Sequence, residues 1–118
     1  MNKNYKISII TVTKNSESFL EECILSLDKQ SYRNYEHIII DGCSTDNTIN
    51  LIKKHKNKIA YWVSEKDEGL YDAMNKGIKK CSGDIIGILN SDDIYYPQAL
   101  RIVNEYFNLN KELDFLFG

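Results

Sequence analysis

Two adjacent carboxylates follow a strongly apolar run in the last third of the chain. Asp92 and Asp93 come after the run 85–89, separated from it only by Asn90 and Ser91. Like charges side by side repel and resist desolvation, so such a pair needs either water or a cation. Mg²⁺ or Mn²⁺, which prefers oxygen ligands, would bridge the pair to a diphosphate. Alternatively, the two acids only fill a turn or cap the next helix.

Similar polar segments follow the other apolar runs of strand length. They are residues 11–15, 41–46, 65–69 and 90–93. On a doubly wound sheet, ligands bind beyond the carboxyl ends of the strands, so these segments are expected to share one edge. Neither a GxGxxG motif nor a P-loop lysine is present, so phosphates there need another means of neutralisation.

Length and composition indicate one globular domain. The chain has 118 residues, 42% of them hydrophobic and 27% charged, and a net charge of -2, which gives no broad field for a nucleic acid. The three cysteines form no CxxC pair, which argues against a disulfide framework or a zinc site. No signal peptide or membrane-spanning run is visible, so we expect a cytoplasmic protein, with membrane association of a full-length protein through other segments left open.

The apolar runs predict five strands alternating with four helices. The runs 38–40 and 85–89 are continuous rather than alternating, which is typical of strands covered on both faces, as in a parallel sheet. The fold class is therefore α/β, with a mostly parallel sheet and helices on both faces. The predicted strands are Lys6–Thr13, Glu36–Asp41, Ile59–Ser64, Asp84–Leu89 and Leu113–Phe117.

The predicted helices carry caps and apolar stripes. Ser18 and Glu21 have the spacing of a capping box, and Thr45 or Asp46 is placed to cap the second helix. In the second, third and fourth helices, apolar residues at helical spacing form stripes that we expect to face the core. They are Ile49 and Ile52 in the second helix, Leu70, Tyr71, Met74, Ile78 and Cys81 in the third, and Leu100, Val103 and Phe107 in the fourth.

Three ordered motifs resemble those of family 2 glycosyltransferases of GT-A fold. The segments are SIITVTKNSESFLEECILSLDKQSYRNYEHIIIDGCSTDNT, then SEKDEGLYDAMNKGI, then GDIIGILNSDD. The chain is most similar to the nucleotide-sugar-binding half of bacterial polysaccharide-assembly transferases. The resemblance implies that residues 1–118 are the donor-binding part of a truncated Rossmann-like GT-A fold, without the acceptor-binding part.

The resemblance also implies roles for particular residues. A nucleotide-sugar donor, with a UDP-sugar expected, would be bound by Thr11, Thr13, Asn15, Asp41, Asp67, Asp72, Asn75 and Asp92, and a divalent metal, Mg²⁺ or Mn²⁺, by Asp92 and Asp93. The sugar would pass with inversion to a glycan, lipid-linked or other acceptor. The catalytic base would lie beyond Gly118, so the chain alone is expected to be inactive.

The chain departs from the family pattern at three positions of this edge, one of which is Lys14, in place of an aromatic residue that is frequent there. Gly42 stands where many members have a second aspartate that faces the base, and Asn90 replaces the first acid of the metal motif. Two alternatives therefore remain: a receiver-like signalling domain, or a degenerate nucleotide-binding module without turnover. The first strand ends in Thr-Val-Thr rather than in acids, which argues against the receiver. Apolar surface left without a second half would also favour a homo-oligomer.

Overall fold

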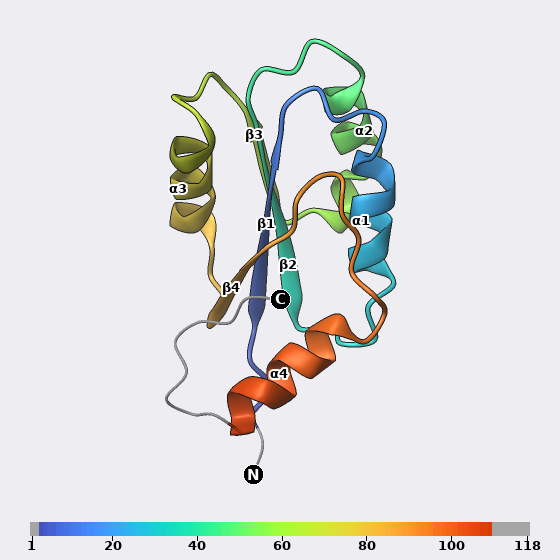
Figure 1. The fold of residues 1–118 in the computed structure, drawn as a ribbon, viewed down its shortest axis with the longest axis vertical. Helices are drawn as coiled ribbons and strands as arrows, with labels where there is room; N and C mark the ends of the chain where they lie inside the picture. Colours follow the sequence, from blue (N-terminus) through green and yellow to red (C-terminus); the bar gives the residue numbers. More distant parts are fainter. Residues whose placement is uncertain (1–2, 110–118) are drawn as a thin grey trace.

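The computed structural model describes residues 3–109, and these form an α/β fold (Figure 1). Four parallel strands make one sheet in the order β3-β2-β1-β4, which confirms the predicted parallel sheet. The elements are β1 (Ile7–Thr13), α1 (Leu20–Asp28), β2 (Tyr35–Asp41), α2 (Thr48–Lys54), the 3₁₀ turn η1 (Lys56–Lys58), β3 (Tyr61–Ser64), α3 (Leu70–Lys80), β4 (Ile85–Ile88) and α4 (Ala99–Leu109). The predicted strand Leu113–Phe117 lies outside the described residues.

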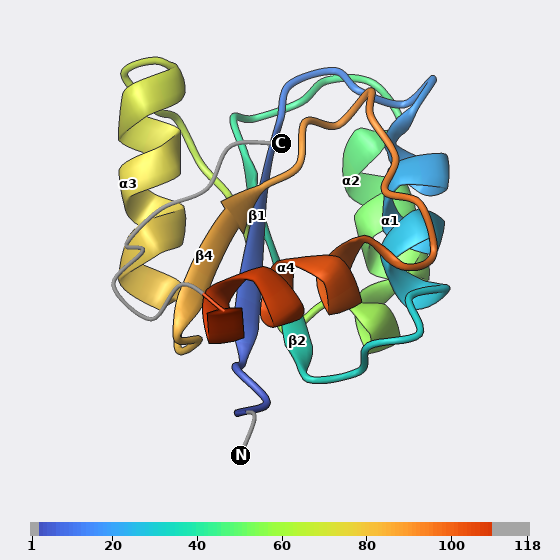
Figure 2. The same ribbon diagram turned by 60° about the horizontal axis from the view of Figure 1, so that its bottom comes forward.

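Helices cover both faces of the sheet. Figure 1 shows α3 on one face and α1 with α2 on the other. The last helix, α4, crosses the amino ends of the strands, and Figure 2 brings it to the front. Leu100 and Phe107 of α4 pack with Cys23 and Leu27 of α1 in one buried cluster, so α4 shares the face of α1.

The strand register aligns three polar residues at the carboxyl edge of the sheet. Thr13, the last residue of β1, pairs with Asp41, the last residue of β2, and Asp41 pairs with Ser64, the last residue of β3. Before them, Ile38, Ile39 and Ile40 are fully buried. The continuous apolar run thus makes β2 a central strand and delivers Asp41 to the edge, as expected for a strand covered on both faces.

The start of α1 differs from the prediction. The helix begins at Leu20, after Phe19, and no side chain caps it, so the predicted capping box of Ser18 and Glu21 is wrong. The amides of Phe19 and Leu20 instead donate to the carbonyl of Ser16, at 3.2 and 3.0 Å. The chain therefore enters α1 through a turn that already satisfies these donors.

The start of α2 follows the prediction more closely. The Asp46 carboxylate accepts hydrogen bonds from the Thr48 amide, at 2.9 Å, and from the Thr48 hydroxyl, at 2.5 Å. Burial opposes ionisation of Asp46, but these bonds outweigh it and lower its pKa. A carboxylate at a helix N-terminus is also stabilised by the positive end of the helix dipole.

The buried face of α3 is not the apolar stripe that the sequence predicts. Leu70 and Tyr71 are 59% and 83% exposed, whereas Ala73 and Gly77 are the buried residues of the helix. A Cβ on Gly77 would lie 2.7 Å from Cγ2 of Ile10 in β1. Small residues therefore let α3 approach the sheet closely, which turns its larger side chains outward.

None of the helices formed by residues 3–109 has the length and apolar character needed to cross a membrane.

Candidate functional site

The carboxylate of Asp41 is buried and fully hydrogen-bonded. Its Oδ1 accepts from the hydroxyls of Thr13, at 2.6 Å, and Ser44, at 2.5 Å. Its Oδ2 accepts from the amide of Ser44, at 2.9 Å, and the hydroxyl of Ser64, at 2.7 Å. Burial opposes ionisation, but these bonds outweigh it and lower the pKa of Asp41. We call Asp41, Thr13, Ser44 and Ser64 the Asp41 cluster.

Thr11 also lies inside the protein. It is fully buried, and its hydroxyl is 2.8 Å from Nε2 of His37, a residue that is itself buried. Burial lowers the pKa of His37 to about 3, so its imidazole is neutral at pH 7. Of the residues predicted to bind the donor, Thr11, Thr13 and Asp41 are therefore enclosed, and their side chains contact other protein groups.

Asn15 ties together the two loops that follow β1 and β2. The backbone amide of Asn15 donates to the Ser44 hydroxyl at 2.8 Å. The side-chain oxygen of Asn15 accepts from the backbone amides of Thr45, at 2.8 Å, and Asp46, at 3.3 Å. Within residues 3–109, Asn15 and Cys43 are the non-glycine residues with positive φ, at 48° and 58°. Uncommon backbone conformations of this kind often gather at functional sites.

The segment after β3 lies over the end of β2. A Cβ on Gly42 would lie 2.7 Å from Oδ2 of Asp67, so the glycine makes room for that carboxylate. Oδ1 of Asp67 accepts from the amide of Gly69 at 3.1 Å. Asp72, in the first turn of α3, accepts from the Glu68 amide at 2.9 Å. The structure thus brings Asp67 to the end of β2.

Asn75 and Asp72 lie farther along the same segment. Asn75 is exposed on α3, and Asp72 is partly exposed. The hydrogen bond from the Glu68 amide and the nearby Lys76 together lower the pKa of Asp72. Both positions stay predicted contacts of the donor.

Asp92 and Asp93 lie in the loop after β4, and both are exposed. This loop meets the loop after β1, because the hydroxyl of Ser91 donates to that of Ser16 at 3.1 Å. Figures 1 and 2 both show the segment between β4 and α4 passing beside the start of α1. The structure therefore brings the acid pair to the same edge of the sheet as the Asp41 cluster.

The acid pair suits a metal that takes part of its coordination from a ligand. In residues 3–109, no three His, Cys, Asp or Glu side chains are arranged to hold a metal ion. The Asn90 side chain donates to Oδ2 of Asp93 at 3.4 Å. Both Asp92 and Asp93 are nevertheless exposed to solvent. Mg²⁺ is commonly held by one or two carboxylates together with substrate phosphates and water. The oxygen donors of Asp92 and Asp93 therefore fit Mg²⁺ or Mn²⁺ bound together with a diphosphate.

Three residues of this edge have roles that the sequence patterns did not predict. Ser44 and Ser64 supply three of the four hydrogen bonds to Asp41. The ammonium of Lys14 donates to the carbonyls of Gly42, at 2.5 Å, and Cys43, at 3.3 Å, which places a positive charge over the end of β2. Ser64 ends a predicted strand, so the expected register of a parallel sheet offered a signal for its place beside Asp41.

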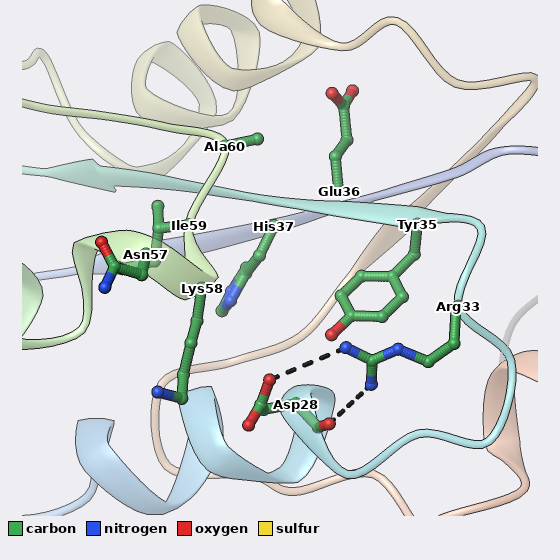
Figure 3. A pocket seen from close by; sticks show the side chains of 9 residues that line it. All are labelled: Asp28, Arg33, Tyr35, Glu36, His37, Asn57, Lys58, Ile59 and Ala60. Atoms are coloured by element: carbon green, nitrogen blue, oxygen red, sulfur yellow. Dashed lines mark hydrogen bonds and ion pairs between the residues drawn. The ribbon is translucent and has the colours of Figure 1, made fainter.

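Two cavities lie away from this edge. The first, of about 270 Å³, is at the amino ends of β2 and β3, between Asp28, Arg33 and Lys58 (Figure 3). The second, of about 450 Å³, lies between the segment 31–34 and α4. Neither contains a residue of the predicted donor site, whose residues come from loops at the carboxyl edge of the sheet and from α3.

The sequence matches a known family over most of its length. The family described as Glycosyl transferase family 2 matches residues 8–115. An uncharacterized glycosyltransferase of Mycobacterium tuberculosis is 42% identical over 88 residues, covering 74% of this chain and 34% of that protein. The poly(ribitol-phosphate) beta-N-acetylglucosaminyltransferase TarS of Staphylococcus aureus is 32% identical over 101 residues, covering 81% of this chain. Since only 18% of TarS is matched, the chain spans a minor part of these relatives.

Solved structures have the same fold. Staphylococcus aureus TarS in complex with UDP-GlcNAc superposes with a TM-score of 0.83 at 27% identity, covering 90% of this chain and 32% of that one. Glucosyl-3-phosphoglycerate synthase of Mycobacterium tuberculosis, in complex with Mn²⁺, UDP and glucosyl-3-phosphoglycerate, has a TM-score of 0.65 at 25% identity, covering 84% and 37%. The GT-A architecture expected from the motifs is therefore confirmed.

Proposed function

This chain belongs to family 2 of the glycosyltransferases, and from that premise we propose that it binds the nucleotide-sugar donor at the carboxyl edge of its sheet. One observation carries the proposal: the loop with the exposed acids Asp92 and Asp93 meets the loop after β1, which is itself hydrogen-bonded to the loop after β2. A negatively charged pair beside the polar loop after β1 suits a diphosphate bound through a cation.

The exposed and partly exposed polar residues of the edge are the proposed contacts of the donor. Asn15, Asp67 and Asn75 border the site from the loop after β1, the loop after β3 and α3. A uridine diphosphate sugar is the proposed donor, supported by the complex of TarS with UDP-GlcNAc. When bound, Mg²⁺ or Mn²⁺ at Asp92 and Asp93 would neutralise the diphosphate and stabilise the charge that develops as it leaves.

The remainder of the reaction requires groups that we place outside this chain. In the proposed inverting reaction, a carboxylate on the acceptor side takes the proton of the attacking hydroxyl as the nucleotide diphosphate departs. The acceptor is proposed to be a glycan or a lipid-linked glycan. The short part of its relatives that the chain spans supports a role in donor binding, so we expect no sugar transfer by these 118 residues.

Calorimetric titration of the chain with UDP and with UDP-GlcNAc tests the proposal. With Mn²⁺ present we expect saturable binding, and with EDTA in place of the metal we expect it to weaken at least about tenfold, which is about 1.4 kcal/mol. Binding that is indifferent to Mn²⁺, or no binding at all, would contradict the proposed function. Labelling of an aspartate by acetyl phosphate would instead support a receiver domain.

A further inference from the structure

The Asp41 carboxylate has no free acceptor site for a ligand. A carboxylate offers about four lone-pair sites, and four donors already occupy the two oxygens of Asp41, at 2.5–2.9 Å. The whole residue is 0% exposed. A direct contact with a nucleotide would require one of these bonds to break and a buried group to become accessible. Such a loss is costly, because the displaced donor is left without a partner.

The bonds of Asp41 continue outward to the loops of the candidate site. The Ser44 hydroxyl donates to Asp41 and accepts from the amide of Asn15, at 2.8 Å. The side-chain oxygen of Asn15 in turn accepts from the amides of Thr45 and Asp46. A chain of hydrogen bonds thus runs from the buried carboxylate to both exposed loops.

We propose that Asp41 is a positioning residue, which holds the loops 14–16 and 42–46 in the geometry that binds the nucleotide and does not touch the nucleotide itself. This inference rests on the proposed function, and it changes the role expected for Asp41 from the family resemblance. Asp41 acts through Ser44 and Asn15, and Thr13 and Ser64 fix its own orientation by joining it to β1 and β3.

The wild-type chain gives the first test, which needs no variant. The ¹³Cγ signals of the aspartates are followed by NMR while UDP is added with Mg²⁺. We expect the signals of Asp92 and Asp93 to move and that of Asp41 to stay in place. A shift of the Asp41 signal as large as that of Asp92 would overturn the positioning role. If UDP does not bind at all, the proposed function fails, and the role of Asp41 in binding fails with it.

Variants of the connecting serine give the second test. Ser44→Ala removes the bridge between Asp41 and Asn15, so we expect UDP binding to weaken by about tenfold. If Asp41 acts through Ser44, the double variant Asp41→Asn/Ser44→Ala binds within about twofold of Asp41→Asn alone. Effects that multiply would show that Asp41 acts independently of Ser44 and would contradict the inference.

The chain offers a matched control at the opposite end of the sheet. The buried hydroxyl of Ser8 also bridges a carboxylate and an amide, donating to Glu36 at 2.6 Å and accepting from Gly83 at 2.8 Å. Ser8→Ala should therefore lower stability much as Ser44→Ala does, but leave UDP affinity unchanged. If both variants lost UDP affinity equally, the loss in Ser44→Ala would be explained by lower stability alone. That result would overturn the proposal.

Discussion

The carboxyl edge of the sheet carries two kinds of acidic group, and their surroundings differ. Asp41 at the end of β2 is buried, and four protein donors satisfy it. Asp92 and Asp93, in the loop after β4, are exposed, and the one hydrogen bond to them given above is the long one from Asn90 to Asp93. The same residue type at the same edge is therefore used in two ways. A satisfied carboxylate organises protein groups, whereas an open pair has acceptor sites left for a cation.

The difference follows from the strands that carry these acids. β2 lies between β1 and β3, so hydroxyls from neighbours on both sides reach its end. β4 is an edge strand of the sheet formed by residues 3–109, where it pairs only with β1, and the acids in the loop after it are exposed. Position in the sheet thus decides whether an acid at this edge becomes structural or remains available to a ligand.

Removal of the Asp41 carboxylate should give the largest effect. Asp41→Ala leaves three hydroxyls and one amide without their acceptor, so we expect a loss of about 3 kcal/mol in the free energy of unfolding. Urea denaturation followed by circular dichroism measures it. Asp92→Ala is the matched control and should stay within about 0.5 kcal/mol of the wild type. Similar losses in both variants would erase the contrast between the two kinds of acid.

The stability that Asp41 confers should also depend on pH in a defined direction. Because its pKa is lowered in the folded state, its contribution is fully present above the unfolded-state pKa of about 3.9 and is lost as pH falls through the folded-state value. The difference in unfolding free energy between wild type and Asp41→Asn should therefore shrink on acidification below about pH 4. Urea titrations of both proteins from pH 7 to pH 3 measure it. If this difference in unfolding free energy grew on acidification, the pKa of Asp41 would not be lowered in the folded state.

Neutralising the open pair should affect ligand binding rather than folding. For Asp92→Asn/Asp93→Asn, we expect UDP binding in the presence of Mn²⁺ to weaken about tenfold, or about 1.4 kcal/mol, with the unfolding free energy unchanged. Calorimetry and urea denaturation of the same preparation measure both quantities. Unchanged affinity would mean that the open pair does not serve the metal and the diphosphate.

Removal of a single donor from the Asp41 cluster should have the smallest effect. Ser64→Ala deletes the bond of 2.7 Å to Oδ2 and leaves the other three, so we expect a loss of about 1 kcal/mol in stability. Differential scanning fluorimetry compared with Asp41→Ala measures it. If Ser64→Ala were as damaging as Asp41→Ala, the cluster would depend on this one contact rather than on all four.

The sequence was informative where one strong pattern decides the structure. The isoleucine run 38–40 predicted a parallel strand covered on both faces, and the positions of the polar segments after the apolar runs predicted that these segments share one edge of the sheet. It was misleading for α3, because apolar spacing does not reveal that Ala73 and Gly77 allow the closest approach to the sheet. The burial of Asp41 was not predicted: the strand ends suggest that Ser64, 23 residues away, lies beside Asp41, but not that four donors enclose the carboxylate.

The close packing of α3 at Gly77 has a consequence for the segment that precedes this helix. Asp67 and Gly69 lie just ahead of α3, and Asp72 lies in its first turn. The distance between α3 and Ile10 of β1 therefore determines how close this acidic segment lies to the end of β2. Gly77→Ala would therefore push the start of α3, together with this acidic segment, away from the end of β2.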